Sequence, residues 1–419
     1  MPISDKQRQI MAFPFTDYDA IIADGAVRSG KTSFMMLAFV DDAMRRFNNQ
    51  RFGVCGKTVD STVKNIISPY LGLRWAREKY DIQWHRTDKI LSVAGNGRKN
   101  IFEIFGGKDE GSFMLIQGRT LAGVLLDEVA LQPRSFVEQA LTRCSVDGSK
   151  FWFNCNPESP NHWFYKEWVS QPAKHNALHL HFLLEDNPSL SKRIIDRYKS
   201  TYSGVFYDRY ILGRWVAAEG TIYRQFADDP ARFVVDDIQG QRIRNAVIGV
   251  DFGGGTSAHA FCCVGFTTRG ALVVLDEYRE KQALTPNRLA DAFVDFVRRC
   301  QSRWLVTDCW CDSAEQTLIN GLRAATAAAR IGLNIGNAMK RPINDRIRAT
   351  CILMGSGRFF VARNCAETID ALKSALWDAK HVTEDVRLDN GTTNIDSLDA
   401  MEYAFEREIP NLIDSWGRS

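Results

Sequence analysis

The sequence predicts an α/β protein of two domains, the first built on a mostly parallel, doubly wound sheet and the second on a mixed sheet. The chain has 419 residues, more than one hydrophobic core typically supports. Up to about residue 182, short apolar strands alternate with helical stretches, which is the pattern of βα units. Strand-like segments cluster again from about residue 245 and give way to a largely helical end.

Composition places the chain among ordinary globular proteins, with 45% hydrophobic and 25% charged residues and a net charge of +3. This charge does not by itself indicate a nucleic-acid binder. The ten cysteines include no CxxC pair, which argues against a zinc site or a disulfide framework and favours a reducing cytoplasm. No signal peptide and no apolar run of roughly 20 residues is present, so we expect a cytosolic protein without a membrane partner.

We expect three segments: a doubly wound domain over residues 1–182, a linker or small lid over 183–232, and a mixed domain over 233–419. Strands of the first are expected in YDAIIADG, RFGVCGKT, AGVLLDEVA and KFWFNCNP. The middle segment carries SKRIIDRYKS and no strong strand pattern. The last segment opens with the strand-like runs NAVIGVDF, FCCVGF, ALVVLDEY and RWLVTDCW.

The run GAVRSGKT, residues 25–32, matches the pattern G-x-x-x-x-G-K-[ST] in full, between an expected strand and an expected helix. The two glycines let the backbone curl so that its N–H groups and the helix dipole face phosphates. Lys31 then reaches the outer phosphates and Thr32 offers its hydroxyl to Mg²⁺. The run therefore predicts an ATP site, with phosphate-binding residues Gly25, Arg28, Ser29, Gly30, Lys31 and Thr32.

An acidic pair follows the apolar run GVLL, about a hundred residues beyond this loop. Asp127 would complete the magnesium shell, and Glu128 would polarise the attacking water of an ATPase. Such a pair is also common in a solvated turn, but after a complete phosphate loop the catalytic interpretation is favoured. The next strand ends in FNCNP, where Asn156 could sense the terminal phosphate or simply form an Asn-Pro turn.

Four further residues are candidates for contact with the nucleotide. Lys6 and Gln7, near the start of the chain, could contact the adenine ring. Arg28 and Arg119 are candidates for stabilising charge on the transferred phosphoryl group, Arg119 being the candidate for action across a subunit boundary. Either arginine could instead be an ordinary surface residue.

Together, GAVRSGKT, QGRTLAGVLLDEVA and NCNPESPNHWFYKEW resemble the large terminase subunit of tailed bacteriophages, the motor that packages viral DNA. The likeness continues in DNPSLS, YDRYILGRWVAAEGTIY, VDFGGGTS and DSLDAMEYA, and so covers nearly the whole chain. That family joins a packaging ATPase to a nuclease of ribonuclease H-like fold. The resemblance therefore implies a P-loop ATPase domain with a mostly parallel sheet, followed by a ribonuclease H-like α/β nuclease domain.

For the first domain, the resemblance implies that Lys31 and Thr32 bind ATP and magnesium, and that Asp127 and Glu128 are the metal-binding and catalytic acidic pair. It places the adenine contact on Gln7 and a phosphate contact on Arg28.

It also places Asn156 in the motif that couples hydrolysis to DNA movement. That motif usually begins with Ser or Thr, where this chain has Cys155, which leaves the sensing role of the position open.

A nuclease of this fold needs three or four carboxylates that converge on two metal ions, Mg²⁺ or Mn²⁺, roughly 4 Å apart. Asp251 ends the run IGV, Asp308 ends WLVT, and Asp396 and Asp399 lie in the helical stretch NIDSLDAMEYAFE. Residues three apart on a helix share a face. The resemblance implies metal ligands at Asp251, Asp308 and Asp399, with Asp396 in an auxiliary position.

Asp276 and Glu277, which end ALVVLDEY, could join this site or belong to a hairpin turn. Residues 321–363 hold eight basic residues and one acidic residue, Asp345, an imbalance that suits contact with a DNA backbone but also solvated helix faces. The basic residues are Arg323, Arg330, Lys340, Arg341, Arg346, Arg348, Arg358 and Arg363.

The stretch VIGVDFGGGTSAHA, residues 247–260, could cradle a nucleotide phosphate or hold a catalytic metal. Since the chain already has a complete phosphate loop, we favour the metal. Gly253 and the glycines after it then form a tight turn that admits the DNA backbone.

The leading hypothesis is thus a motor that hydrolyses ATP to translocate double-stranded DNA into a procapsid and cleaves concatemeric DNA. The alternatives are a DNA helicase or remodeller without nuclease activity, and a nucleotide-switched scaffold, against which Glu128 argues. The resemblance implies as partners the small terminase subunit, the portal protein and further copies in a docked ring. The chain could be a monomer in solution, and the host cytoplasm is its expected location.

Overall fold

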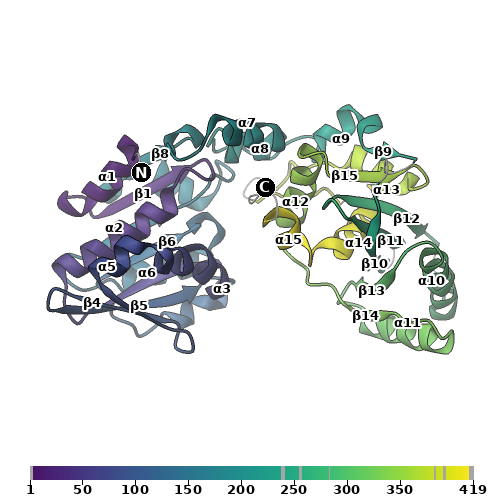
Figure 1. Cartoon of the computed structure of the whole chain (residues 1–419), viewed down its shortest axis with the longest axis horizontal. Coiled ribbons are helices and arrows are strands. Elements are labelled where there is room, and N and C mark those ends of the chain that lie inside the picture. Colours follow the sequence, from purple (N-terminus) through teal and green to yellow (C-terminus); the bar gives the residue numbers. More distant parts are fainter. Residues whose placement is uncertain are drawn as a thin grey trace. The chain divides into compact units, whose positions relative to one another are not determined.

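The computed structural model describes residues 3–236, 241–253, 257–282, 284–381, 384–389 and 393–414. The chain divides into two compact units, one made mainly of Met1–Lys199 and Val205–Ala217, the other mainly of Ala218–His381 and Asp385–Ser419. Each unit has its own sheet (Figure 1). Each unit also has its own buried hydrophobic residues.

The first unit is built on an eight-stranded sheet with the order β3-β4-β5-β2-β6-β7-β1-β8. All neighbouring pairs from β5 to β8 in this order are parallel, and only β3–β4 and β4–β5 are antiparallel. The strands are β1 (Ala20–Gly25), β2 (Arg51–Gly56), β3 (Asp81–His85), β4 (Ile90–Gly95), β5 (Arg98–Gly106), β6 (Gly123–Asp127), β7 (Lys150–Asn154) and β8 (Ala177–Phe182). The predicted mostly parallel sheet is confirmed.

Helices cover both faces of this sheet, because its central strands are apolar on both sides. In β1, Ile21 and Ala23 join the core cluster that includes α2, whereas Ala20 and Ile22 join the cluster that includes α6. The helices are α1 (Asp5–Ala12), α2 (Lys31–Arg46), α3 (Val59–Thr62), α4 (Ser68–Gly72), α5 (Arg74–Lys79), α6 (Arg134–Thr142), α7 (Lys192–Thr201) and α8 (Gly204–Tyr210). The doubly wound arrangement expected from the alternating pattern is thus present.

The second unit contains a mixed seven-stranded sheet with the order β14-β13-β10-β11-β12-β15-β9. The β10–β11 and β11–β12 pairs are antiparallel, and the other neighbouring pairs are parallel. The strands are β9 (Val234–Val235), β10 (Ile243–Asp251), β11 (His259–Thr267), β12 (Leu272–Glu280), β13 (Val306–Cys311), β14 (Asn334–Asn337) and β15 (Phe359–Ala362). A mixed sheet is what the sequence predicts here.

The central strand β10 separates two layers. Ile248 and Val250 pack into the cluster that contains α10, while Gly249 on the opposite face lies against α14. The helices are α9 (Arg224–Asp228), α10 (Pro286–Gln301), α11 (Gln316–Ala328), α12 (Ile343–Gly355), α13 (Ala366–Ser374), α14 (Asp396–Phe405) and α15 (Ile409–Asp414). Alternation along β10 therefore directs its odd-numbered residues, including Asp251, to the face that α14 covers.

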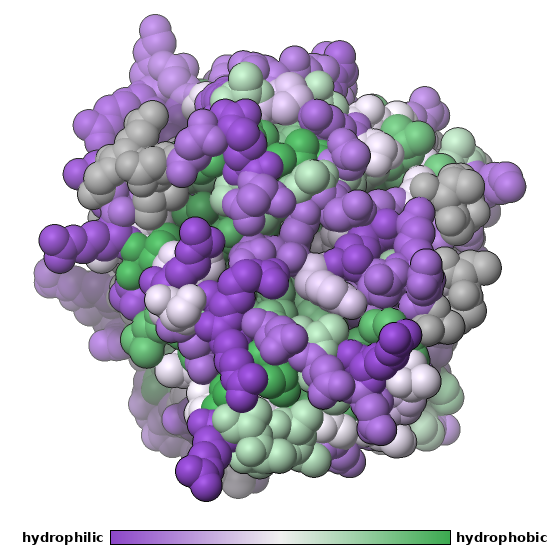
Figure 2. Space-filling model, turned by 90° about the vertical axis from the view of Figure 1, so that its right-hand side faces the viewer, coloured by the Kyte–Doolittle hydropathy of each residue, from purple (hydrophilic) through white to green (hydrophobic). Residues whose placement is uncertain are grey.

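On the face drawn in Figure 2, hydrophilic side chains predominate and hydrophobic ones lie in patches between them. Within the described ranges, none of the helices combines the length and the apolar character that crossing a membrane requires.

Candidate active sites

The predicted phosphate loop forms a tight turn between β1 and α2. Gly25 and Gly30 have φ angles of +118° and +88°, values that favour glycine. A Cβ atom at Gly25 would lie 2.0 Å from the Phe182 carbonyl oxygen, and one at Gly30 would lie 2.7 Å from Nε2 of Gln7. Both glycines are therefore required by backbone conformation and by close packing, and the loop opens directly onto the amino terminus of α2.

Lys31 occupies the interior of this loop. Its ammonium donates hydrogen bonds to the carbonyls of Gly25 (3.1 Å) and Ala26 (2.7 Å) and to Oδ1 of Asn156 (3.3 Å). Burial lowers the pKa of Lys31 to about 8, because a buried ammonium loses its hydration. In this structure the cation is thus held by carbonyl groups of its own loop and by Asn156.

Thr32, Asp127 and Asn154 meet at the carboxyl edge of the sheet. The Thr32 hydroxyl donates to Oδ1 of Asp127 (3.1 Å) and accepts from Nδ2 of Asn154 (2.7 Å), and the same Nδ2 also donates to Asp127. The β6–β7 register pairs Asp127 with Asn154 directly. Burial, and then the neighbouring Glu128 carboxylate, raise the pKa of Asp127. This cluster of oxygen atoms beside Thr32 suits a hard cation such as Mg²⁺.

Asn154 was not among the residues predicted from the sequence, which singled out Asn156 two positions later. The usable signal is the strand end itself, because parallel neighbours bring the last residues of β6 and β7 to one edge. Asn156 instead contacts Lys31, so the two asparagines of FNCNP address different groups.

Glu128 follows Asp127 with a left-handed φ of +52°. A non-glycine residue adopts this conformation rarely, and such strain clusters at functional sites. Glu128 therefore lies just outside the strand that ends at Asp127, so the two carboxylates can take different roles.

The other predicted contacts of this site lie around the loop. Gln7 is buried and donates from Nε2 to the Ser29 carbonyl (3.2 Å), and the Ser29 hydroxyl donates to the Ala26 carbonyl (3.0 Å). Arg28 has a φ of +57°, and its carbonyl accepts from Nδ2 of Asn187 (2.6 Å).

Two further basic residues considered for this site are held in ion pairs. Lys6 pairs with Asp186 at 2.6 Å and Arg119 with Glu103 at 3.3 Å. Neither pair places the cation on the phosphate loop.

In the second unit, Asp251 at the end of β10 faces the first turn of α14, which carries Asp396 and Asp399. Gly249, two residues earlier on the same face, lets the helix approach the strand closely. Burial, with the neighbouring carboxylates of Asp399, Asp312 and Asp396, raises the pKa of Asp251 to about 9. These aspartates therefore form one electrostatically coupled acidic cluster.

Asp308 does not join this cluster. The β10–β13 register pairs Asp308 with Val247, four residues before Asp251, which is about 13 Å along a strand. Asp308 instead accepts a hydrogen bond from Nδ2 of Asn334 at 2.8 Å.

Asp312, directly after β13, occupies the corresponding position. Its N–H donates to the Val250 carbonyl at 2.9 Å, which continues the ladder to the level of Asp251. The sequence contains a signal for it, the aspartate that follows the alternating run VTDCWC, but the preceding run WLVT predicts a strand that ends at Asp308.

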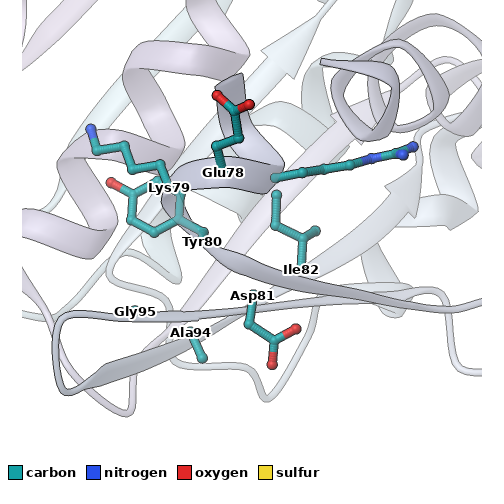
Figure 3. A pocket seen from close by; sticks show the side chains of 8 residues that line it. Glu78, Lys79, Tyr80, Asp81, Ile82, Ala94 and Gly95 are labelled. Carbon is teal, nitrogen blue, oxygen red and sulfur yellow. The ribbon is translucent and has the colours of Figure 1, made fainter. Parts of the chain in front are cut away.

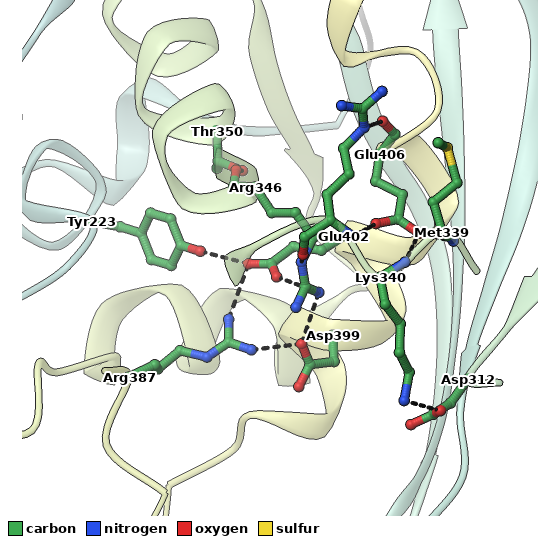
Figure 4. A network of polar contacts seen from close by, with 11 residues as sticks. Tyr223, Asp312, Met339, Lys340, Arg346, Thr350, Arg387, Asp399, Glu402 and Glu406 are labelled. Carbon is green, nitrogen blue, oxygen red and sulfur yellow. Dashed lines mark hydrogen bonds and ion pairs between the residues drawn. The ribbon is translucent and has the colours of Figure 1, made fainter. Parts of the chain in front are cut away.

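Basic side chains engage the cluster from several elements (Figure 4). Arg346 of α12 and Arg387 both reach Oδ1 of Asp399, at 3.0 and 2.7 Å, and both pair with the fully buried Glu402. Arg279 of β12 pairs with Oδ2 of Asp396 at 3.1 Å. Ion pairs with largely buried arginines thus hold Asp396 and Asp399 in place.

Asp276 and Glu277 lie outside the cluster. Asp276 pairs with Arg299 of α10 at 2.8 Å. Glu277 accepts from the N–H groups of Glu367 (2.7 Å) and Thr368 (2.9 Å) and so caps the amino terminus of α13. Both carboxylates hold helices on the sheet.

Several of the eight basic residues expected to contact DNA are used inside the unit. Arg346 is buried in the network just described, Arg363 pairs with Asp236, and Arg323 donates to the Ile335 carbonyl. Of these three, Arg346 is buried, whereas Arg323 and Arg363 are exposed beside their partners.

The glycine turn proposed after Asp251 is described only in part. The Gly253 N–H donates to Nδ1 of His259 at 3.2 Å, and a Cβ atom at Gly253 would lie 2.4 Å from the Ala258 carbonyl carbon. Gly254, Gly255 and Thr256, also included in that prediction, lie outside the described residues.

The donor set of the acidic cluster fits a hard divalent ion, since it consists of carboxylates from two strand ends and one helix. In the part of the chain that the structure describes, no group of three or more His, Cys, Asp or Glu side chains already has the spacing of a metal site. Basic side chains engage Asp312, Asp396 and Asp399 in this structure.

A hollow of about 720 Å³ lies beside α5 and the β3–β4 hairpin, lined by Arg77, Glu78, Lys79, Tyr80, Asp81, Ile82, Ala94 and Gly95 (Figure 3). Strand β3 forms one edge of the sheet, and β8, next to β1, forms the other edge. None of the predicted site residues lines this hollow, so it is separate from both candidate sites.

Comparisons with known proteins identify the family of the chain. Residues 22–227 match the family model of the terminase large subunit, T4likevirus-type, N-terminal domain. A solved structure of the large terminase from a thermophilic bacteriophage is 36% identical, with a TM-score of 0.86 over 97% of this chain and 99% of that one. Structures of that phage's large terminase with ADP (35% identity, TM-score 0.84) and with ATP-γ-S (34%, 0.82) each cover 96% of this chain and 98% of theirs. Comparison with curated proteins gives no match. The identity and the coverage together show that the chain belongs to the large terminase family of bacteriophages.

Proposed function

We propose that the chain is the motor subunit of a phage DNA-packaging machine, which hydrolyses ATP to translocate double-stranded DNA into a procapsid and cleaves concatemeric DNA. The observation that carries the proposal is the convergence of Lys31, Thr32 and Asp127 at a phosphate loop that opens onto α2. Large terminase structures of a related phage with ADP and ATP-γ-S support the use of a nucleotide.

In this proposal, the loop from Gly25 to Thr32 would hold the nucleotide phosphates, with Gln7 beside the adenine. Thr32 and Asp127 would hold the magnesium ion, which when bound neutralises charge on the phosphoryl group. Lys31 must exchange its bonds to the Gly25 and Ala26 carbonyls for bonds to phosphate oxygens.

Glu128, displaced from the strand by its left-handed backbone, would orient and deprotonate the attacking water. Asn156, bonded to Lys31, would report the state of the terminal phosphate to the rest of the unit.

In the second unit we assign the divalent ions, Mg²⁺ or Mn²⁺, to Asp251, Asp312 and Asp399, with Asp396 as the auxiliary carboxylate. When bound, two such ions stabilise the attacking and leaving oxygens of a phosphodiester. Asp312 replaces Asp308 in this assignment, because the strand register places Asp312 level with Asp251.

The partners that follow are double-stranded DNA, a small terminase subunit, the portal of the procapsid and further copies of the chain in a docked ring. The working location would be the host cytoplasm and, during packaging, the capsid portal.

Two substitutions in the full chain test the division of labour. Lys31→Ala should abolish DNA-stimulated phosphate release and leave Mn²⁺-dependent plasmid nicking intact, and Asp251→Asn should do the reverse. Loss of both activities in both folded variants would contradict two separate sites. ATP hydrolysis without any nicking by the wild-type chain would favour a helicase or remodeller.

A further inference from the structure

The loop between β14 and α12, residues 338–342, brings a lysine onto the acidic cluster of the second unit. Nζ of Lys340 lies 2.5 Å from Oδ1 of Asp312 (Figure 4). The lysine side chain is 42% exposed. A pair this exposed forms weakly when the lysine is free to move, so what holds Lys340 in place matters.

Glu406 fixes the backbone of this loop. Its carboxylate is fully buried and accepts three backbone N–H groups, from Met339 (2.5 Å), Lys340 (3.0 Å) and Arg341 (2.9 Å). The Arg341 side chain also donates to the Glu406 carbonyl at 2.9 Å. Lys340 itself has a φ of +50°, a left-handed value that a lysine rarely adopts. The loop is thus held in a strained conformation that directs Lys340 toward Asp312.

Glu406 directly follows α14, the helix that carries Asp396 and Asp399. One helix therefore positions two carboxylates of the acidic cluster and also the loop that supplies a cation to a third. Each of these aspartates forms an ion pair with a basic side chain. Lys340 pairs with Asp312, Arg279 with Asp396, and Arg346 and Arg387 with Asp399.

These cations differ in their freedom to leave. Arg346 and Arg387 are 8% and 2% exposed and are fixed by Glu402 as well as by Asp399. Lys340 is far more exposed, and its side chain has four rotatable bonds beyond the held backbone. It is the cation of this set that can withdraw from its carboxylate without disturbing the core.

We propose that Lys340 is a tethered counter-ion of Asp312 that competes with a divalent ion for this carboxylate and so sets the metal concentration that the nuclease site requires. The inference rests on the proposed nuclease function. A divalent ion bound to a carboxylate oxygen lies about 2 to 2.5 Å from it, and the ammonium already lies 2.5 Å from Oδ1 of Asp312. Two cations cannot share that position, so Lys340 must withdraw when a metal binds Oδ1 of Asp312.

Calorimetric titration of the full chain with Mn²⁺, without DNA or nucleotide, tests this directly. Lys340→Ala should bind Mn²⁺ about 3- to 10-fold more tightly than the wild type. Asp251→Asn identifies the heat that belongs to this site, and Lys373→Ala, an exposed lysine of α13, is the matched control that should leave the affinity unchanged. Equal or weaker Mn²⁺ binding by Lys340→Ala, or no Mn²⁺ binding by either chain, would overturn the inference.

A second variant separates charge from side-chain volume. Lys340→Arg keeps a cation on the loop and should retain an affinity within about twofold of the wild type. If it bound Mn²⁺ as tightly as Lys340→Ala, charge would not be the cause and the inference would fail.

Plasmid nicking measured in parallel separates this inference from the proposed function. If Lys340→Ala bound Mn²⁺ more tightly but no variant nicked the plasmid, the nuclease proposal would fail and the counter-ion role of Lys340 would stand. If the wild type and Lys340→Ala both nicked the plasmid with the same Mn²⁺ midpoint and the same Mn²⁺ affinity, the nuclease proposal would stand and the counter-ion role would fail.

Discussion

Gly249 of β10 lies directly against Ala400 of α14, so closely that a Cβ atom at Gly249 would come within 1.8 Å of the Ala400 carbonyl oxygen. This contact sets the distance between strand and helix. Since Asp251 lies two residues beyond Gly249 and Asp399 one residue before Ala400, the same contact brings the two aspartates to one site.

Gly249→Ala should therefore destabilise the second unit by roughly 3 kcal/mol, the upper end of the range for overpacking, because the backbone of α14 must move. The free energy of unfolding, measured by urea titration, reports this. Gly321→Ala in α11 is the control, since nothing lies within 4 Å of its added Cβ, and alanine there should raise stability by roughly 0.5 to 1 kcal/mol. Similar unfolding curves for the two variants would show that the close contact is not structural.

Asp312→Asn should reduce Mn²⁺-dependent nicking by at least about 100-fold, whereas Asp308→Asn should stay within a few-fold of the wild type. The removal of one metal ligand from a two-ion site accounts for the first result. The activity of Asp308→Asn should persist because Asp308 pairs with Val247, four residues before Asp251, and hydrogen-bonds to Asn334 instead. Initial rates of plasmid nicking at a saturating Mn²⁺ concentration decide between the two aspartates, and a larger loss in Asp308→Asn would reverse the assignment.

Asn154→Ala should raise the Mg²⁺ concentration needed for half-maximal ATP hydrolysis by roughly 10- to 100-fold, the usual effect of losing a residue that orients metal ligands. The Asn154 amide donates to both Thr32 and Asp127 and keeps their oxygens in place. Asn156→Ala should change the Mg²⁺ requirement less, because its contact is with Lys31. Phosphate release measured over a range of Mg²⁺ concentrations compares the two variants. An unchanged half-maximal Mg²⁺ concentration in Asn154→Ala would contradict a role of Asn154 in orienting the metal ligands.

The phosphate loop could be predicted from the sequence because its parts are contiguous. Gly25 and Gly30 encode the backbone angles by residue type, and Lys31 and Thr32 follow directly. Four strands of the first sheet, β1, β2, β6 and β7, were readable from apolar runs for the same reason. The strands β3, β4, β5 and β8 were not among the expected strands.

The acidic cluster was only partly predictable, because its geometry depends on strand register. The run WLVT suggested a strand that ends at Asp308, but Leu305 is 63% exposed and the strand runs from Val306 to Cys311. Cys309 and Cys311 are fully buried, so the alternation continues past Asp308 and delivers Asp312 to the edge. From the sequence, Lys340 is one of eight basic residues expected to contact DNA. Its loop is held by Glu406, 66 residues away, and a contact at that separation cannot be read from neighbouring residues.

Asp24, the residue before the phosphate loop, should make the first unit sensitive to acid. Its side chain is buried, with Oδ1 bonded to His179 (2.8 Å) and His181 (3.1 Å) of β8 and Oδ2 accepting from the Trp215 indole (2.7 Å). Burial alone would raise the pKa of Asp24, but the bonds to the two histidines outweigh it and hold the pKa well below the ordinary value of 3.8.

A lowered pKa in the folded state contributes stability that is present above the unfolded pKa and is lost as the pH falls below it. Asp24→Asn, which cannot ionise, should therefore reduce the free energy of unfolding by roughly 2 to 3 kcal/mol near neutral pH. The difference from the wild type should shrink as the pH falls from 5 to below 3.8, because the unfolded wild-type chain then takes up a proton at Asp24. Urea titrations at pH 7, 5, 4 and 3.5 measure this difference, and a difference that stayed constant over this range would show that the Asp24 charge does not stabilise the loop.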